Sequence, residues 1–491
     1  MSAAVKFIRE NRERHLDQLN ELLRIPSIST DPELAGEVRR AGVWVRDRLK
    51  AAGCTRAELF DTPKHPIVYG EWLGAPGAPT VLVYGHYDVQ PVDPLELWTT
   101  PPFEPTVRDG RLFARGASDD KGQMIIYANA LEAHLRTSGT CPVNVKFLIE
   151  GEEEISSPSL DAFIMSHLDL LKCDAVVVSD TGFFAKGVPS ITHALRGLVY
   201  LQVDIYGTKS DLHSGSFGGA VINPAFAAAQ IVAGLKDMNG RIKVPGFYDK
   251  VRKLTAAERK AFASLPHKDA KYKKELGAPE LFGEKGFTTL ERTWARPTLE
   301  VNGIWGGFTG VGAKTVIPAE AHIKISMRLV PNQKPDEIAK QVIAYIKKIA
   351  PRAVKVEAKN LHGAEAWLAE TDHPALAAAA RALKRSYGKT PVFMREGGSI
   401  PVVGTFGKLL GVPAVLMGIG LPDDNLHAPN EKLDLDQFYR GNEAATALFE
   451  ELPASFTGGG APATRTKAVP KQKTPARAIA GVALLKGQKK A

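Results

Sequence analysis

The stretch Thr80–Pro91, TVLVYGHYDVQP, places an apolar run directly before a histidine and an aspartate. The run Thr80–Gly85 is almost continuously apolar, as is typical of a strand buried on both faces of a sheet. Residues i and i+2 of an extended chain share a face, so Asp88 can accept the second ring N–H of His86 and orient it as a metal ligand. A strand-end turn with a hydrogen-bonded histidine fits the same triplet. The triplet alone leaves both interpretations open.

Strand and helix patterns alternate on both sides of this stretch. Val143–Ile149 and Ala175–Ser179 are further apolar runs, and Lys121–Arg136 carries apolar residues at helical spacing. A first helix is predicted over residues 3–24, before Pro26. Strands that alternate with helices predict an α/β layer with a mainly parallel sheet.

A different pattern begins near His193. Leu198–Gly207 alternates between apolar and polar residues, like a half-exposed antiparallel strand. Further strands are predicted at 298–304, 321–330 and 353–359, and helices at 223–235 and 334–350. Together these elements predict an α+β domain with one open sheet.

The α/β pattern returns at about His373, so we interpret the middle domain as an insertion into the first. The returning elements are a helix at 373–387, a strand at 392–395, an apolar run at 414–420 and a helix at 434–451. The predicted boundaries are 1–192 and 373–455 for the two parts of the α/β domain, 193–372 for the inserted domain and 456–491 for a disordered basic tail.

The positive charge of the chain lies at its carboxyl end. The formal net charge is +9, but eight basic residues and no acidic one lie beyond Pro453. The remainder is therefore nearly neutral, and we expect no nucleic-acid partner.

Three cysteines, Cys54, Cys141 and Cys173, are widely spaced and odd in number, which predicts neither a disulfide framework nor a C-x-x-C metal site. No stretch reaches the roughly 20 apolar residues of a membrane span, and the first residues lack the apolar core of a signal peptide. We therefore expect a cytoplasmic protein without a membrane partner.

Acidic residues and a second histidine follow the predicted strands of the α/β domain. RGASDDKG at 115–122 also suits a helix N-cap, whereas the four carboxylates of EGEEE at 150–154 are hard to explain structurally. Open α/β sheets bind ligands at the carboxyl ends of their strands, so we expect one shared site. Its candidate residues are His86, Asp119, Glu153, Glu154, Asp180 and His427.

Two imidazoles with several carboxylates and no thiolate suit a pair of divalent ions such as Zn²⁺, with Mn²⁺ as the alternative. Such ions, about 3.5–4 Å apart, can share a carboxylate and lower the pKa of a water between them. A neighbouring carboxylate that is not a ligand can take the proton of that water as general base. The pattern predicts hydrolytic chemistry.

The ordered motifs of the chain resemble those of the dinuclear-metal aminoacylase/carboxypeptidase-type peptidases, and most closely their carnosinase-type, cytosolic non-specific dipeptidase branch. The resemblance extends to about Leu452. It rests on GHYDVQP, RGASDDKG, EGEEE, VSD, DLHSG, KTVIP, MRLVPNQ, REGGSIP and LPDDNLHAPNEK, in this order. It implies a metal-dependent dipeptidase with two divalent ions per subunit. It also implies a zinc-peptidase α/β domain that is interrupted by a lid domain through which two copies dimerise.

The resemblance further implies roles in metal binding. His86 and Asp180 would hold one ion, Glu154 and His427 the other, and Asp119 would bridge them beside a cis Asp119–Asp120 peptide. Glu153 would be the general base, and Asp88 would orient His86.

Four more residues receive roles in substrate binding from the resemblance. His213 in DLHSG would reach the active site of the partner subunit and stabilise the oxyanion. Arg328 would bind the substrate carboxylate, and Thr315 and Ser399 would help to place the substrate.

Two alternatives stay open. An N-acyl amino acid deacylase of the same family is one, although the segment 239–295 enlarges the lid as in the dipeptidase branch. The other is a non-catalytic metal-binding protein or an RNA-associated protein that uses its basic tail. The complete ligand set argues against the metal-binding form, and salt-dependent RNA binding that is lost on deletion of residues 456–491 would support the RNA-associated form.

Overall fold

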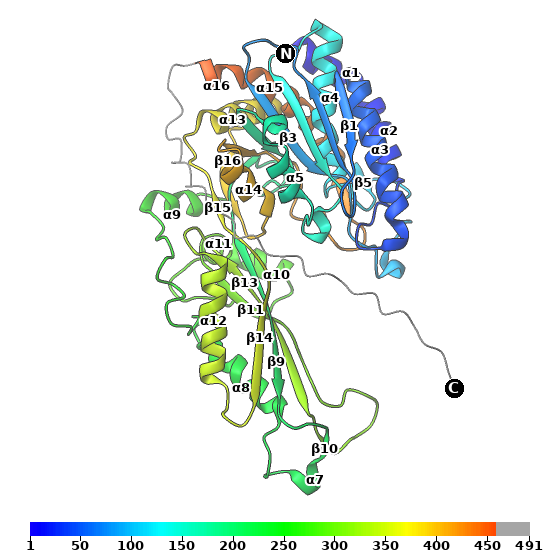
Figure 1. Ribbon diagram of the computed structural model, residues 1–491. Helices are drawn as coiled ribbons and strands as arrows, with labels where there is room; N and C mark the ends of the chain where they lie inside the picture. Colours follow the sequence, from blue (N-terminus) through cyan, green and yellow to red (C-terminus); the bar gives the residue numbers. More distant parts are fainter. Residues whose placement is uncertain (458–491) are drawn as a thin grey trace, which may run out of the picture. The chain divides into compact units, whose positions relative to one another are not determined.

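Four parallel strands form the centre of a nine-stranded sheet in the computed structural model, which describes residues 1–457 (Figure 1). The strand order is β1-β2-β6-β3-β7-β17-β8-β15, with β16 also paired to β8. Strands β6, β3, β7 and β17 run parallel, and antiparallel pairs flank them. The strands are β1 (Arg56–Phe60), β2 (Ile67–Trp72), β3 (Thr80–His86), β6 (Asn144–Glu150), β7 (Ala175–Val178), β8 (Ser190–Leu195), β15 (Trp367–Leu368), β16 (Val392–Glu396) and β17 (Ala414–Leu416).

Alternate residues of the central strands enter two different cores. On β3, Val81 and Val83 are buried with one layer of helices, while Leu82 and Tyr84 are buried with the other. Burial on both faces explains why these strands are continuously apolar.

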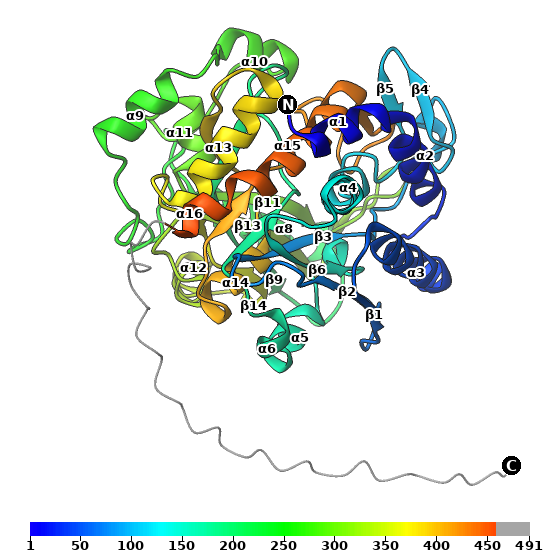
Figure 2. The ribbon, with the colours of Figure 1, turned by 90° about the horizontal axis from the view of Figure 1, so that it is seen from above.

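Two layers of helices cover this sheet (Figure 2). One layer contains α2 (Arg12–Leu23), α3 (Ala35–Ala52), α4 (Lys121–Ser138), α13 (Pro374–Tyr387) and α15 (Leu435–Glu451), with α1 (Ala3–Glu10) packed outside α4. The other contains α5 (Leu160–Ser166), α6 (Leu168–Leu171) and α14 (Pro401–Leu409). A small sheet of β4 (Thr106–Arg108), β5 (Arg111–Phe113) and β18 (Lys432–Asp434) lies apart from the large one.

A four-stranded antiparallel sheet in the order β11-β13-β9-β14 has a core of its own. Residues along β9 are alternately buried and half-buried, because helices α8 and α12 cover only one face. Its elements are β9 (Gly197–Tyr206), β11 (Thr298–Trp305), β13 (Glu320–Leu329), β14 (Lys355–Ala364), α8 (Pro224–Leu235) and α12 (Pro335–Ile349). The short strands β10 (Leu212–His213) and β12 (Val316–Ile317) pair separately, and α7 (Ser214–Phe217) follows β10.

The predicted helix over residues 3–24 is two helices, and its prediction as one helix is wrong. The backbone of Asn11, with φ of −111° and ψ of 21°, departs from helical geometry, so α1 ends there before α2 begins. The side-chain amide of Asn11 donates to the Phe7 carbonyl at this helix end.

The segment 239–295 contains three helices that its polar composition did not predict: α9 (Ala256–Ala263), α10 (Asp269–Glu275) and α11 (Thr289–Trp294). A capping box begins both α9 and α11, formed by Thr255 with Glu258 and by Thr288 with Glu291. The T-x-x-E spacing in the sequence is the signal that would have located these two helices.

The predicted α/β and α+β layers are confirmed, and the domain boundaries stay predictions. Strand β8 spans the predicted boundary at 192, and β15 pairs with β8 in the large sheet. Of the predicted tail, residues 456–457 belong to α16 (Pro453–Thr457), and residues 458–491 lie outside the described part. None of the helices in residues 1–457 is long and apolar enough to cross a membrane.

Candidate metal centre

Parallel strands carry the candidate ligands to one edge of the large sheet. His86 is the last residue of β3 and lies opposite Glu150, the last residue of β6. Asp180 follows the end of β7, the neighbour of β3 on its other side. These strands are parallel and in register, so their carboxyl ends meet at the same edge, as the sequence predicted.

Asp119 lies between the two histidines of the site. Its Oδ1 is 3.1 Å from Nε2 of His86, and its Oδ2 is 2.9 Å from Nε2 of His427. Two groups of three residues each bring their ligand atoms within 4.8 Å of one another: His86, Asp119 and Asp180, and Asp119, Glu154 and His427. Asp119 belongs to both groups, so the arrangement suits two neighbouring cations with one shared carboxylate.

The backbone around Asp119 is fixed by a glutamate that sequence reasoning did not select. The Asp119–Asp120 peptide is cis, as the resemblance implied. The fully buried carboxylate of Glu431 accepts hydrogen bonds from the backbone N–H groups of Gly116, Ser118 and Asp119, at 3.0 to 3.1 Å, and from Arg115. Glu431 stands in the motif LPDDNLHAPNEK, but only the fold shows which segment it supports.

The loop between β17 and β18 presents His427. Its backbone has a φ of 59°, and its ring is 55% exposed, so this side of the centre is open. Asp424 holds the loop by accepting hydrogen bonds from Leu421 N–H, the Ser118 hydroxyl and the Lys432 ammonium.

The acids of the run Glu150–Glu154 are of two kinds: Glu150 and Glu152 are held by hydrogen bonds from the surrounding fold, whereas Glu153 and Glu154 lie beside the metal centre. Glu150 accepts hydrogen bonds from Tyr84 and Ser157, and Glu152 accepts four, from Thr62, Ser159 and the His65 backbone.

Glu154 instead lies 3.5 Å from Nε2 of His427, and the Gln90 side-chain amide donates to it at 2.7 Å. The described residues donate no hydrogen bond to the carboxylate of Glu153, which is half-buried beside the charges of His86 and Asp119. Gln90 is a second residue that the sequence reasoning missed, although it belongs to GHYDVQP.

Asp88 contacts both halves of the centre. The ring Nδ1 of His86 donates to the backbone carbonyl of Asp88 at 3.1 Å, and the Asp88 carboxylate is 3.4 Å away. The same carboxylate accepts the backbone N–H groups of Glu153 and Glu154, at 3.2 and 3.1 Å. Asp88 thus contacts His86 through its backbone carbonyl and holds the acid run through its carboxylate.

The electrostatics of the centre fit cations. Burial, with the charge of Asp119, raises the pKa of Glu153 to about 6 and that of Glu154 to about 8. Burial and the charge of Asp119 also raise the pKa of Asp180 well above its ordinary value. Several carboxylates held this close repel one another, and divalent cations would remove that repulsion. The donor set, two imidazoles and three carboxylates, is one that Zn²⁺ and Mn²⁺ accept.

The predicted substrate residues form two separate pairs. Arg328, near the end of β13, donates to the Ser399 hydroxyl at 2.8 Å. The segment that carries Ser399 is linked to the segment that carries Asp180: the carboxylate of Glu396, at the end of β16, accepts the N–H of Gly182, two residues after Asp180.

His213 and Thr315 form the other pair, with 3.4 Å between Nε2 and Oγ1. They adjoin the opposite ends of β9 and β13 from Arg328, and ten-residue strands span roughly 30 Å. Within one chain, the structure does not bring His213 to the metal centre.

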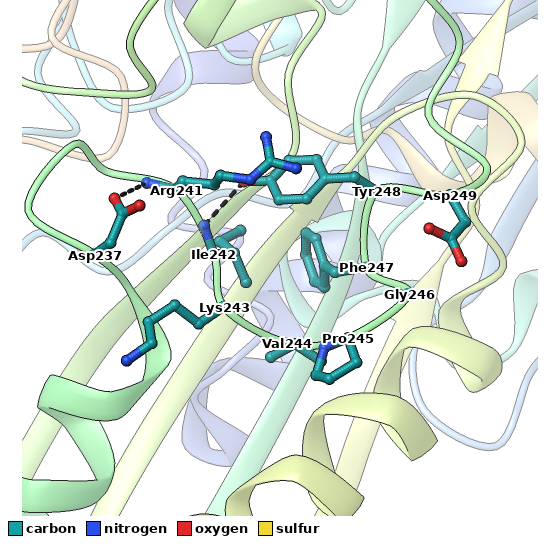
Figure 3. A pocket seen from close by; sticks show the side chains of 10 residues that line it. All are labelled: Asp237, Arg241, Ile242, Lys243, Val244, Pro245, Gly246, Phe247, Tyr248 and Asp249. Carbon is teal, nitrogen blue, oxygen red and sulfur yellow. Dashed lines mark hydrogen bonds between the residues drawn. The ribbon is translucent and has the colours of Figure 1, made fainter.

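A hollow on the surface of the inserted domain is separate from these groups (Figure 3). It is lined by the loop from Asp237 to Asp249, where the Arg241 guanidinium lies 4.5 Å from the Tyr248 ring centre. Asp237 accepts the N–H of Arg241, and the Tyr248 hydroxyl accepts that of Ile242. These polar groups bond to one another, so the hollow is part of the loop's own packing.

Comparison with known proteins agrees with this geometry. The chain is 35% identical to the Cys-Gly metallodipeptidase dug1 of Schizosaccharomyces pombe, over 91% of this chain and 97% of that protein. It is 30% identical to the Beta-Ala-His dipeptidase of Homo sapiens, over 92% of both proteins. The solved structure of the di-peptidase Dug1p of Saccharomyces cerevisiae superposes with a TM-score of 0.81 at 30% identity, covering 92% of this chain and 98% of that one.

Residues 82–451 match the sequence profile described as "Peptidase family M20/M25/M40". This range includes His86, Asp119, Glu154, Asp180 and His427, and it begins inside β3. Because the profile spans most of the chain and the curated relatives match over nine-tenths of it, this protein belongs to the M20/M25/M40 family of peptidases.

Proposed function

We propose that the protein is a metallo-dipeptidase that binds two divalent ions in each subunit. We expect these ions to be Zn²⁺, with Mn²⁺ as the alternative. The observation that carries this proposal is Asp119, whose two carboxylate oxygens each face a different histidine. His86 and Asp180 would hold one ion, Glu154 and His427 the other, with Asp119 shared. When bound, the ions supply Lewis acidity where water and the scissile carbonyl meet.

Glu153 is our candidate for the general base. Glu153 is half-buried, and burial raises its pKa to about 6, near the value at which a carboxylate exchanges protons efficiently at neutral pH. It takes a proton from the attacking water and delivers it to the leaving amine. Asp88 fixes the backbone of Glu153 and so holds this carboxylate in place.

Arg328 and Ser399 are our candidates for binding the free carboxylate of the dipeptide. The Arg328 guanidinium offers planar N–H donors that match a carboxylate, and Ser399 already orients it. A carboxylate bound here fixes how far from the metal centre the scissile bond lies, which favours dipeptides over longer peptides.

We propose that two copies dimerise through the inserted domain and that His213, with Thr315, serves the active site of the partner subunit. Nδ1 of His213 accepts the N–H groups of Gly215 and Ser216, so the neutral ring carries its proton on Nε2 and can donate to an oxyanion. Exposed apolar side chains on the inserted domain support its proposed role in dimerisation, because such side chains often mark contact surfaces. They lie on α8, on β11 and on the loop after β11, and are Phe226, Ile304, Trp305, Phe308 and Val311.

The proposal extends to the domains and the location of the protein. Residues 1–192 and 373–455 would form the catalytic domain, and residues 193–372 the lid. The separate cores of the two sheets support this division. The cytoplasm is the proposed compartment, since the three cysteines are free and Cys54 and Cys141 are buried.

Metal removal tests the proposal directly. Protein treated with a chelator and then dialysed should hydrolyse no dipeptides, and Zn²⁺ or Mn²⁺ should restore activity with about two ions bound per subunit, counted by atomic spectroscopy. Undiminished dipeptide hydrolysis by metal-free protein would refute the dinuclear mechanism. N-acyl amino acids tested beside dipeptides distinguish the deacylase, which would turn them over faster.

A further inference from the structure

Arg196 is the one residue between β8 of the large sheet and β9 of the lid sheet. Leu198, two residues further along the chain, pairs with Arg328 across β9 and β13. Arg196 therefore stands where the two sheets join, beside the residue that would bind the substrate carboxylate.

The loop Gly397–Ser399 is attached to Arg196 at three points. Nε of Arg196 donates to the Gly397 carbonyl at 3.0 Å, and its backbone N–H donates to the Gly398 carbonyl at 3.1 Å. The Ser399 hydroxyl donates to the Arg196 carbonyl, and the same hydroxyl accepts from Arg328. The position of Ser399, and through it of Arg328, thus depends on Arg196.

Gly397 lacks a side chain where Arg196 lies. A Cβ at this position would be 2.8 Å from Nη2 of Arg196 and 3.2 Å from the Thr293 carbonyl oxygen. Alanine at Gly397 would therefore displace the guanidinium without changing any charge.

Neither arginine forms an ion pair within the described residues. In residues 1–457, no carboxylate oxygen lies within 4.0 Å of a nitrogen of Arg196 or Arg328, whereas another buried arginine, Arg395, has such a partner in Glu258. Among the same residues, Nη1 of Arg196 is buried and has no hydrogen-bond partner. Burial and the charge of Arg328 lower the pKa of Arg196 to about 10, and the more distant carboxylate of Glu300 opposes this shift. Both side chains therefore stay cationic at neutral pH. Two unneutralised, partly buried cations favour an anion between or beside them.

We propose that Arg196 is a positioning residue of the carboxylate subsite: it fixes the Gly397–Ser399 loop and adds a second positive charge beside Arg328. This inference rests on the proposed function. Arg196 acts on the carboxylate of the substrate indirectly, by positioning Ser399 and Arg328, and also through its own positive charge. It takes no part in the chemical step. Its removal should therefore raise KM for substrates with a free carboxylate and leave kcat nearly unchanged.

Steady-state kinetics on a dipeptide and on its C-terminal amide test this assignment. The variants are Arg196→Met, which removes charge and hydrogen bond, Arg196→Lys, which keeps the charge alone, and Arg328→Ala. We expect Arg196→Met to raise KM for the dipeptide by roughly 30- to 100-fold, and Arg196→Lys by roughly 3- to 10-fold. KM for the amide should change less than about threefold in both.

Gly397→Ala provides a variant in which Arg196 itself is intact. It should raise KM for the dipeptide about as much as Arg196→Lys. Gly407→Ala on α14, where a Cβ meets no atom within 4 Å, is the matched control and should behave like the wild type. Thermal melting of every variant separates a local effect from loss of folded protein.

The outcomes separate the two proposals. Equal losses on dipeptide and amide in Arg328→Ala would remove carboxylate recognition from the proposed function. If Arg328→Ala discriminates between the substrates while Arg196→Met and Gly397→Ala impair both equally, or lower kcat alone, only the role of Arg196 is overturned.

Discussion

The acids in the run Glu150–Glu154 have different hydrogen-bond partners. These partners decide whether a carboxylate supports the surrounding fold or faces the metal centre. Glu152 is saturated by hydrogen bonds from Thr62, His65 and Ser159. Glu153 and Glu154 follow it on one short turn, whose backbone N–H groups are bound by Asp88. Neighbours in sequence thus point one carboxylate into the scaffold and two toward the metal centre.

Glutamine substitutions of Glu153 and Glu154 should give two different results. Glu153→Gln should keep both ions and lose turnover by several orders of magnitude, because the proton acceptor is gone. Glu154→Gln should lose one ion, because a neutral amide is a poor ligand in place of a carboxylate. Metal content per subunit and kcat, measured on the same preparations, distinguish the two.

Glu152→Gln is the matched control for this pair. It should lower the melting temperature, because the amide NH₂ faces N–H and O–H donors, while the folded fraction still binds two ions. If Glu153→Gln lost metal and Glu154→Gln kept it, the roles of the two acids would be exchanged.

Helix α9 joins the lid segment to the catalytic sheet. Phe262 of α9 and Trp294 of α11 share a small core with Met394 of β16. Beside this core the Glu258 carboxylate pairs with Arg395 of β16, whose side chain is 3% exposed. The segment 239–295 therefore anchors the lid to the strand that leads into the Gly397–Ser399 loop.

Glu258→Gln should destabilise the protein by roughly 3 kcal/mol, because it leaves the buried Arg395 charge unpaired. Burial opposes ionisation, but hydrogen bonds from Arg252 and Thr255 and the charge of Arg395 lower the pKa of Glu258 to about 2. A lowered pKa stabilises the fold above the ordinary value near 4.5, and this contribution is lost as the pH falls toward 2.

Denaturant unfolding of the wild type and Glu258→Gln at several pH values measures this contribution. The difference in unfolding free energy should be largest near pH 7 and shrink below about pH 4.5. Glu337→Gln, which removes an exposed pair with Lys250, is the control and should cost less than about 1 kcal/mol. A pH-independent difference would show that the charge of Glu258 is not what stabilises this contact.

At the scale of the whole molecule, the inserted domain separates two residues that the proposed function assigns to one active site. Arg328 lies at one end of the β9–β13 pair and His213 lies beyond the other end, so the two do not meet within one chain. The proposed symmetric dimer would bring them together, because each inserted domain would then reach the metal centre of the other subunit.

Complementation between two inactive variants tests this arrangement. Homodimers of His213→Ala and of Glu153→Ala should each be nearly inactive. In a mixed dimer, the subunit with intact Glu153 receives an intact His213 from its partner, so co-expression should recover about one working site per mixed dimer. Mixed dimers that are verified by mass and stay inactive would mean that His213 acts in its own subunit or not at all.

Local sequence determined most of the elements and the edge where the ligands gather. Apolar runs such as Thr80–Gly85 predicted the central strands because burial on both faces demands continuous apolar sequence, and β3 ends within one residue of the prediction. Parallel strands end at one edge, so the order of the motifs along the chain was enough to place His86, the acid run and Asp180 together.

Only the tertiary structure decided which polar groups meet across the chain. Glu431 supports the backbone of Asp119 from 312 residues away, and Arg196 holds Ser399 from a distance of 203 residues in sequence. The spacing of apolar residues along the chain indicates which face of a helix or strand is buried. It carries no information about which group pairs with a single buried hydrogen-bond donor or acceptor. That partner is set by how the packed layers bring distant loops together, and it is why Glu431, Gln90 and Arg196 emerged only from the fold.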